Sequence, residues 1–268
     1  MSAMLDLAGV GKTFGAGGEA EVRALDGIDL VLQAGEFVTV IGSNGAGKST
    51  LLRAITGHLP PDRGSIRLAG ADITRAPVHA RAGLIGRIAQ DPQESSCASM
   101  TIAENLAMAA LRGRRRGLAR AVTRARRAAF RTALAETGLG LEARLDARMG
   151  TLSGGQRQAV ALLMATLAAP RLLLLDEHLA ALDPRAAGLV MDLTARLVVE
   201  GGLTTLMVTH DMRAAIAWGS RLVMMHAGRI VLDVAGAEKA ALTVAALVDR
   251  FHTVSGADMT DDRTMLTA

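Results

Sequence analysis

A glycine-rich segment at residues 42–49, Gly-Ser-Asn-Gly-Ala-Gly-Lys-Ser, matches the pattern G-x-x-x-x-G-K-[ST] at every position. Glycines allow backbone N–H groups to curl inward around phosphate oxygens, and a helix starting at Lys48 would add the positive end of its dipole. In this pattern the lysine reaches the β- and γ-phosphates, and the hydroxyl of Ser49 binds Mg²⁺. The segment therefore predicts a site for a magnesium nucleoside triphosphate. The residues expected to line it are Gly42, Ser43, Asn44, Gly45, Ala46, Gly47, Lys48, Ser49 and Thr50.

Two acidic residues, Asp176 and Glu177, directly follow a run of four leucines. A buried strand ending there would place Asp176 near the Mg²⁺, usually through a water molecule. Glu177 could then polarise the attacking water as a general base. The alternative is a pair of solvated acids at a strand end, but the phosphate loop favours the catalytic interpretation.

A third motif, Leu-Ser-Gly-Gly-Gln at residues 152–156, has the form of a helix start. Ser153 is a suitable N-cap, and Gly154 and Gly155 would leave backbone N–H groups open to an anion. An ordinary glycine-containing helix cap is the alternative.

The polar motifs follow short apolar runs that read as buried strands at residues 37–41, 172–175 and 204–208. The third of these runs is followed by His210, although a lone histidine is more often structural. In open α/β sheets, ligands bind beyond the carboxyl ends of the strands. The pattern therefore predicts an α/β fold with a largely parallel sheet and one site at its edge.

The rest of the chain is expected to be more varied. Residues 101–111 and 118–147 are rich in Ala, Leu and Arg and predict helices of an inserted subdomain. Residues 221–234 predict a hairpin that turns at Ala227-Gly228. The polar residues 256–268 are expected to form a loose tail.

Leu-Ser-Gly-Gly-Gln at residues 152–156 matches the signature of the ABC ATPase family, and it lies about two dozen residues before Asp176. With the phosphate loop and the acidic strand at the expected places, residues 4–250 resemble this family. The resemblance implies a P-loop NTPase (RecA-like) core with an N-terminal antiparallel β part and a helical insertion subdomain. It implies one nucleotide-binding domain over the whole chain, 1–268. Its parts would be an ATPase core at 1–90 and 160–255, a helical subdomain with the signature motif at 91–159, and the tail at 256–268.

The same resemblance suggests roles for residues outside the three motifs. Gln90 looks like the Q-loop glutamine, which senses Mg²⁺ and touches the transmembrane partner, and residues 181–183 look like the D-loop. His210 looks like the switch histidine that contacts the γ-phosphate. Phe14 looks like the aromatic that stacks on adenine, with core packing as its alternative. Together with Lys48 and Glu177, Gln90 and His210 are the expected catalytic residues, and Ser49, Gln90 and Asp176 the expected metal-binding residues.

The family also implies a head-to-tail dimer of two copies that enclose two ATP molecules. Each ATP, with its Mg²⁺, would lie on the phosphate loop of one copy. It would face the signature residues of the other copy, Ser153, Gly154, Gly155 and Gln156. Hydrolysis would then require closure, because half of the site arrives from the partner.

Departures from the commonest family pattern point to a subgroup. His178 stands where most members have proline, and residues 158–167 after the signature are apolar. Together with the hairpin at 221–234, these features make the chain resemble a bacterial importer subgroup. Such ATPases work with a membrane permease and an extracytoplasmic binding protein, at the cytoplasmic face of the plasma membrane, and tryptophan or related amino acids are suggested substrates. A soluble ABC ATPase of a non-transport system, such as cluster assembly, and the energiser of an exporter remain alternatives.

The composition also limits which other classes of protein this chain can belong to. The net charge of +4 on 268 residues does not by itself indicate nucleic-acid binding, and no such partner is expected. The single cysteine, Cys97, excludes an internal disulfide or a cysteine metal cluster. No apolar run reaches the ~18–20 residues of a membrane span, so another chain would cross the bilayer. Nine arginines at 112–131 predict a solvated helical face, with contact to anionic lipid or nucleic acid as the alternative.

Overall fold

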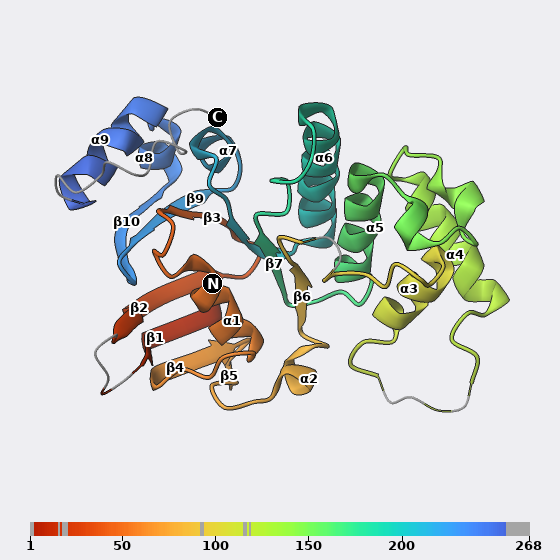
Figure 1. The fold of residues 1–268 in the computed structure, drawn as a ribbon, viewed down its shortest axis with the longest axis horizontal. Coiled ribbons are helices and arrows are strands. Elements are labelled where there is room, and N and C mark those ends of the chain that lie inside the picture. The colour runs from red at the N-terminus through yellow and green to blue at the C-terminus, as the bar shows by residue number, and fades with distance from the viewer. Residues whose placement is uncertain are drawn as a thin grey trace. The chain divides into compact units, whose positions relative to one another are not determined.

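The structure is a computed structural model, which describes residues 3–15, 17, 21–91, 94–114, 117 and 119–255. The chain forms two compact units (Figure 1). The first unit contains Met1–Val78 and Thr204–Ala268, and the second contains His79–Leu203. These divisions differ from the predicted domain boundaries, and the assignment of core and helical subdomain stays a prediction.

An antiparallel sheet forms the N-terminal part of the first unit. Strand β1 (Ala3–Phe14) pairs with β2 (Val22–Gln33) and with β4 (Arg63–Leu68), and β4 pairs with the short β5 (Ala71–Asp72). Leu5 and Leu7 of β1 are buried while the residues between and after them are more exposed, as expected for side chains that alternate between two faces of a sheet. The predicted antiparallel β part is confirmed.

The second sheet of this unit carries the parallel strands. Strand β3 (Phe37–Gly42) pairs in parallel with β8 (Thr204–Val208) and with β9 (Arg221–His226), and β10 (Arg229–Ala235) runs antiparallel to β9. Every residue of β8 is buried, as in a parallel strand covered on both faces. The predicted hairpin is also confirmed, since Ala227 and Gly228 turn the chain with φ values of 44° and 76°.

Four helices accompany these sheets among the described residues of the first unit. They are α1 (Lys48–Thr56), α7 (Met212–Ala217), α8 (Gly236–Ala240) and α9 (Val244–Ser255). Leu247 and Phe251 of α9 pack with Met212 of α7 and Leu222 of β9 in one hydrophobic cluster. This cluster packs α7, which begins two residues after His210, against the sheet.

Among its described residues, the second unit contains two strands and several helices. Strand β6 (Ile85–Ile88) pairs in parallel with β7 (Leu172–Asp176). Short elements α2 (Val78–Arg81), η1 (Leu141–Arg144) and η2 (Met149–Thr151) connect the longer helices α3 (Ile102–Ala110), α4 (Arg124–Ala135), α5 (Gly154–Thr166) and α6 (Pro184–Gly201). Leu106, Phe130, Leu134 and Leu163 form the centre of a buried cluster that joins α3, α4 and α5.

The helix predicted over residues 118–147 was wrong in extent. Helix α4 begins at Arg124, where the Oγ1 of Thr123 accepts a hydrogen bond from the backbone N–H of Arg126 at 3.2 Å. It ends at Ala135, and Gly138 and Gly140 then adopt φ values of 68° that no α-helix contains. The helix predicted at 101–111 is confirmed as α3, with a capping box at Thr101. The predicted tail at 256–268 lies outside the described residues.

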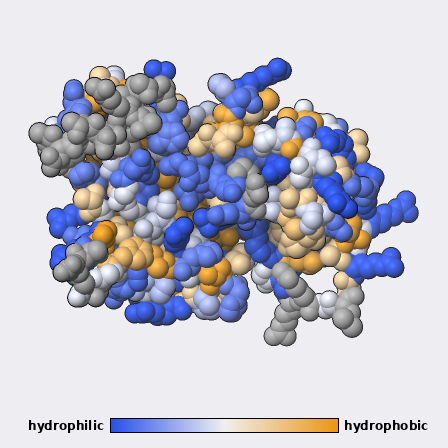
Figure 2. Space-filling view, in the orientation of Figure 1, coloured by the Kyte–Doolittle hydropathy of each residue, from blue (hydrophilic) through white to orange (hydrophobic). Residues whose placement is uncertain are grey.

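Several of the described arginines of the arginine-rich segment are at the surface. Arg114, Arg120, Arg124 and Arg131 are exposed, and Figure 2 shows long hydrophilic side chains projecting where α4 lies. Arg127 forms a two-armed ion pair with Asp146, at 2.8 and 2.6 Å. The solvated face stays a prediction, and the lipid and nucleic-acid alternatives are untested.

Candidate functional site

The glycine-rich loop lies between β3 and α1, as predicted. Gly42 ends β3, and a Cβ atom there would lie 2.3 Å from the backbone oxygen of Met225. Gly47 precedes α1 with a φ of 98°, and a Cβ atom there would lie 2.3 Å from the backbone oxygen of Ala24. Because neighbouring backbone approaches so closely, these two positions require glycine whatever the loop binds.

Lys48 is the first residue of α1, directly after this loop, and is 7% exposed. Its Nζ donates hydrogen bonds to the backbone oxygens of Gly42, at 2.6 Å, and Ser43, at 2.9 Å. A buried ammonium group needs such partners. No side chain of the described residues caps α1 at Gly47, so the start of this helix, next to a fixed cation, is suited to an anion. Ser49, the next residue of the helix, is exposed.

His210 lies at the same edge of the parallel strands as the loop. Val208 of β8 is paired with Val40 of β3, and the backbone N–H of Thr209 donates to the oxygen of Val40 at 3.0 Å. The exposed His210 is followed by Asp211, whose carboxylate caps α7 by accepting from two backbone N–H groups. The adjacent cap gives His210 a fixed place beside the phosphate loop.

Phe14 ends β1 in the same unit and is 44% exposed. An aromatic ring this exposed does not serve as a core residue, which weakens the packing alternative. The stacking of adenine on Phe14 remains a prediction.

In the second unit, the parallel pairing of β6 and β7 brings Gln90, Asp176 and Glu177 to one edge. Leu175 is paired with Ile88, and two residues beyond Ile88 the Nε2 of Gln90 donates to the Oε2 of Glu177 at 3.2 Å. Gln90 and Glu177, which are 87 residues apart, are therefore in direct contact.

Asp176 is the last residue of β7 and is buried. An Nη2 atom of Arg87 lies 3.6 Å from its Oδ2, which offsets part of the cost of burying a carboxylate. Arg87 was not among the residues predicted from the sequence. The available signal was a single charged residue in an otherwise apolar strand, Ile85–Ile88.

Glu177 has an unusual backbone. Its φ is 44°, a left-handed conformation that it shares with only three other non-glycine residues of the described chain, Ala69, Ala169 and Ala227. This conformation costs roughly 1–2 kcal/mol for a residue with a Cβ atom. The chain turns sharply here, since the backbone N–H of Ala180 donates to the oxygen of Glu177 at 3.0 Å.

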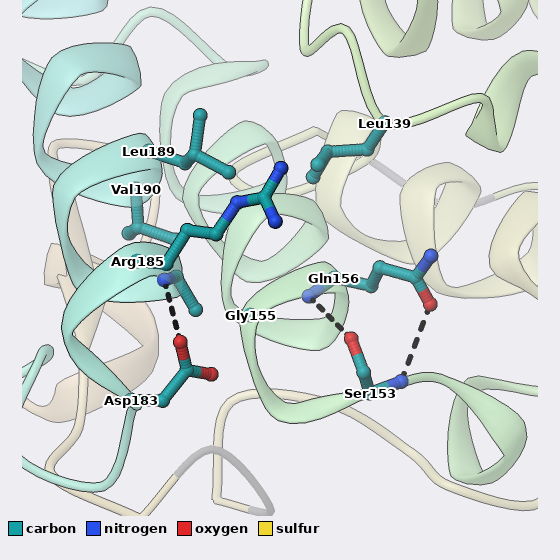
Figure 3. A pocket seen from close by; sticks show the side chains of 9 residues that line it. Leu139, Ser153, Gly155, Gln156, Asp183, Arg185, Leu189 and Val190 are labelled. Atoms are coloured by element: carbon teal, nitrogen blue, oxygen red, sulfur yellow. Dashed lines mark hydrogen bonds between the residues drawn. The ribbon is translucent and has the colours of Figure 1, made fainter.

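The signature motif starts α5 with the predicted cap. The backbone N–H of Gln156 donates to the Oγ of Ser153 at 3.3 Å, and the backbone N–H of Ser153 donates to the Oε1 of Gln156 at 3.2 Å (Figure 3). Ser153 and Gly154 are exposed. The predicted N-cap is thus confirmed, and the first turn of α5 presents backbone N–H groups to solvent.

A pocket of about 230 Å³ lies beside this cap. Its walls include Ser153 and Gln156 of the signature and Asp183, Arg185 and Leu189 at the start of α6 (Figure 3). Asp183 caps α6 by accepting from the backbone N–H of Ala186 at 3.0 Å. The predicted D-loop therefore lies next to the signature motif.

The residue after Glu177 is a buried histidine. His178 is 3% exposed, and burial lowers its pKa from 6.5 to about 4. Its Nε2 lies 3.4 Å from the Oγ1 of Thr194 in α6. From the sequence, His178 stood out only as a departure from the usual pattern, with no role predicted for it.

The groups present suit a magnesium nucleotide. The hydroxyl of Ser49, the carboxylate of Asp176 and the amide of Gln90 all offer oxygen atoms, the ligands that Mg²⁺ prefers. No group of three or more His, Cys, Asp or Glu side chains arranged to hold a metal occurs among the described residues. Nor does any described helix combine the length and apolar character needed to cross a bilayer.

Comparison with known proteins identifies the family. The model of the ABC transporter family matches residues 25–180. The tyrosine transport ATP-binding protein of Clostridioides difficile is 40% identical over 249 residues, which cover 93% of this chain and 99% of that protein. The phosphonates import ATP-binding protein PhnC of Frankia casuarinae is 35% identical and covers 86% of this chain and 89% of its own length.

Solved structures give the same result. A dimeric bacterial ABC transporter cassette, MJ0796, has a TM-score of 0.75 and 28% identity, and covers 87% of this chain and 98% of its own. The same cassette in a post-hydrolysis state with ADP and Pi has a TM-score of 0.74. The predicted P-loop NTPase fold is confirmed by these likenesses. The chain belongs to the ABC transporter family and is an ATP-binding, ATP-hydrolysing subunit that uses ATP with Mg²⁺.

Proposed function

We propose that this subunit drives the import of a small solute, with an amino acid as the first candidate, through a separate membrane permease. The observation that carries the proposal is the 40% identity to a tyrosine transport ATP-binding protein over nearly the whole of both chains. Other relatives are named for the import of phosphonates, aliphatic sulfonates and methionine. An aromatic amino acid is therefore the first substrate to test.

In this proposal the first unit binds the nucleotide. The backbone of the phosphate loop, residues 42–50, surrounds the β- and γ-phosphates, and Lys48 contacts them with its ammonium group. Phe14 stacks on the adenine. The burial of Lys48 among loop carbonyls supports this, because a fixed cation beside an uncapped helix start attracts an anion.

The proposed hydrolytic groups follow β7 and β8. Asp176, Ser49 and Gln90 are the proposed Mg²⁺-binding residues, with Asp176 acting through a water molecule. His210 contacts the γ-phosphate. Glu177 accepts a proton from the attacking water. The hydrogen bond from Gln90 to Oε2 of Glu177 supports this assignment, because it holds the carboxylate in one orientation beside the proposed Mg²⁺ ligands.

The signature residues are proposed to act on the nucleotide of a second copy. Ser153, Gly154, Gly155 and Gln156 would contact that ATP when two copies close on it. The exposure of Ser153 and Gly154 at the start of α5 supports this, as do neighbouring structures that are described as dimeric. Closure then assembles the complete catalytic site.

The proposed partners are a second copy of this chain, an integral-membrane permease and, through it, an extracytoplasmic substrate-binding protein. The subunit would lie peripherally at the cytoplasmic face of the plasma membrane. The names of relatives as transport or import ATP-binding proteins support this arrangement.

An affinity pull-down from detergent-solubilised membranes of the host, analysed by mass spectrometry, tests the proposal. We expect a multi-span permease to be recovered, and the binding protein encoded with it to bind tyrosine or tryptophan by calorimetry. An untagged chain from the same membranes is the control. Recovery of only soluble partners would contradict transport and favour a non-transport ABC ATPase, while an outward-pumping permease without a binding protein would favour export.

A further inference from the structure

The segment after β7 sets the direction in which Glu177 points. Asp176 is fixed by the strand, and Glu177 adopts a left-handed backbone with a φ of 44°. A left-handed non-glycine residue persists only where its surroundings hold it. Before Glu177, the backbone is held by the pairing of β7 with β6. After Glu177, the next residue is His178.

His178 contacts α6 through its side chain. Its imidazole is buried, and Nε2 lies 3.4 Å from the Oγ1 of Thr194, which is also buried. Thr194 lies in the middle of α6, a helix that begins at the cap of Asp183 beside the signature pocket. One side chain therefore links the residue next to Glu177 to the helix that lines the signature.

The hydrogen bonds of Thr194 decide the tautomer of His178. The Oγ1 of Thr194 donates its one proton to the backbone oxygen of Val190 at 2.8 Å. A hydroxyl has a single proton to donate, so towards His178 the Oγ1 must accept, and Nε2–H of a neutral imidazole must donate.

We infer that His178 is a positioning residue for ATP hydrolysis, which holds the backbone of Glu177 through the Nε2–H contact to Thr194. The inference rests on the proposed role of Glu177 as the general base. The effect of His178 should fall on the chemical step and not on nucleotide affinity, because misplacing a reacting group by about 1 Å can cost on the order of 10²-fold in rate.

Matched substitutions of His178 test the inference in the full-length chain. Gln places an amide nitrogen near the position of Nε2, whereas Asn places one near Nδ1, and Leu offers no donor. We expect His178→Gln to keep kcat within about threefold, and His178→Asn and His178→Leu to lose about tenfold or more in kcat with KM for ATP unchanged. Rescue by Gln but not by Asn is a pattern that simple filling of space does not produce.

Substitutions of Thr194 provide a second measurement in case His178→Leu does not fold. Thr194→Val should lower kcat as His178→Leu does, and Thr194→Ser, which keeps the hydroxyl, should not. Thr166→Val is the control, because the Oγ1 of Thr166 makes the same bond to a backbone oxygen four residues earlier, that of Leu162 at 3.0 Å in α5. A parental kcat in folded His178→Leu or Thr194→Val would overturn the inference, as would a loss of thermal stability without a change in kcat.

Failure of this inference can be told from failure of the proposed function. If Glu177→Gln retains parental hydrolysis, the base is misassigned and the inference falls with it. If Glu177→Gln is inactive while His178→Leu and Thr194→Val turn over normally, the base stands and only the positioning role is wrong.

Discussion

The three lysines of this chain show how selectively one residue type is used, since almost all other basic residues are arginine. Lys48 donates to two loop carbonyls, and Lys239 donates to the backbone oxygens of Ile216, Trp218 and Gly219 at the C-terminal end of α7. Lys12 pairs with Asp62 at 2.7 Å. A compact ammonium fits among carbonyls that a planar guanidinium cannot enter, so two of the three lysines occupy places where arginine would not substitute.

Glu177→Gln tests the proposed base at this scale. We expect ATP binding to be retained and turnover to fall roughly 10²–10⁴-fold, because an amide cannot accept the proton of the attacking water. Turnover is measured by phosphate release at saturating ATP, and binding by a fluorescent nucleotide. Hydrolysis at the parental rate would show that another group is the base.

Local chemistry was readable from the sequence, whereas contacts between distant residues were not. The phosphate loop is contiguous, so its pattern alone predicted its strand, loop and helix. The contact between Gln90 and Glu177 joins residues 87 positions apart; the family resemblance gave each residue a role, but it did not predict that they touch. Nothing local indicated that Arg87 pairs with Asp176 or that His178 packs on Thr194, because those partners come from other elements.

At the scale of elements, the start of α5 combines two constraints on one glycine. A Cβ atom on Gly155 would lie 2.9 Å from the Cβ of Ala186 in α6. Part of the need for glycine in the signature is therefore the close packing of two helices, independent of any nucleotide. The sequence predicted only the other constraint, that glycine leaves backbone N–H groups open, because the packing of α6 against α5 cannot be read from the motif.

Gly155→Ala should therefore destabilise the protein by about 1–3 kcal/mol, as overpacking does, even without nucleotide. Urea unfolding of the apo protein measures this. Gly188→Ala is the matched control, since Gly188 lies in α6 and a Cβ atom added there would have no neighbour within 4 Å, and alanine should stabilise a helix by up to about 1 kcal/mol. The double variant Gly155→Ala, Ala186→Gly should recover much of the loss, and no recovery would contradict the packing explanation.

Ser153→Arg tests the action of the signature on a second copy. The substitution adds bulk and charge at an exposed helix start, and we expect it to block ATP-dependent dimerisation while nucleotide affinity of the monomer is nearly unchanged. Size-exclusion chromatography with ATP, in the Glu177→Gln background, measures dimerisation. Ser153→Asn is the control, because asparagine keeps the N-cap. Equal dimerisation of the arginine variant would reject the action in trans.

The extent of helices was the weakest part of what the sequence predicted. Ala, Leu and Arg favour helix throughout much of the segment from 118 to 147, so composition gave no reason to stop. The actual ends come from Thr123, which caps α4, and from glycines 138 and 140 in left-handed conformations. Caps of this kind are visible in a sequence, but they compete with strong helix propensity on both sides.

At the scale of the whole molecule, the proposed catalytic groups are distributed over both units. The phosphate loop, Phe14 and His210 belong to the first, and Gln90, Asp176, Glu177 and the signature belong to the second. Each unit has a hydrophobic cluster of its own. Because His178 is buried and lies next to Glu177, its variants allow stability and catalysis to be measured on one residue.

Global stability should fall as the pH is lowered from about 6.5 to about 4. In this window the unfolded chain protonates His178 at its ordinary pKa of 6.5, while the folded chain keeps it neutral down to a pKa of about 4. The unfolded state therefore binds one more proton, and the free energy of unfolding rises with pH. The full shift corresponds to about 3 kcal/mol. Urea unfolding of the apo protein at intervals between pH 4 and 7 measures it.

His178→Gln isolates this contribution, because glutamine does not titrate in the window and preserves the position of Nε2. The carboxylates with lowered pKa values, among them Asp26, Asp62 and Asp146, lose their stabilisation only as the pH falls through values below 3.8, so they affect parent and variant alike at the acid end. We expect the parent to show a steeper loss of stability than the variant between pH 6.5 and 4. Parallel curves would mean that His178 titrates at its ordinary pKa in the folded protein, and the lowering of its pKa by burial would then be wrong.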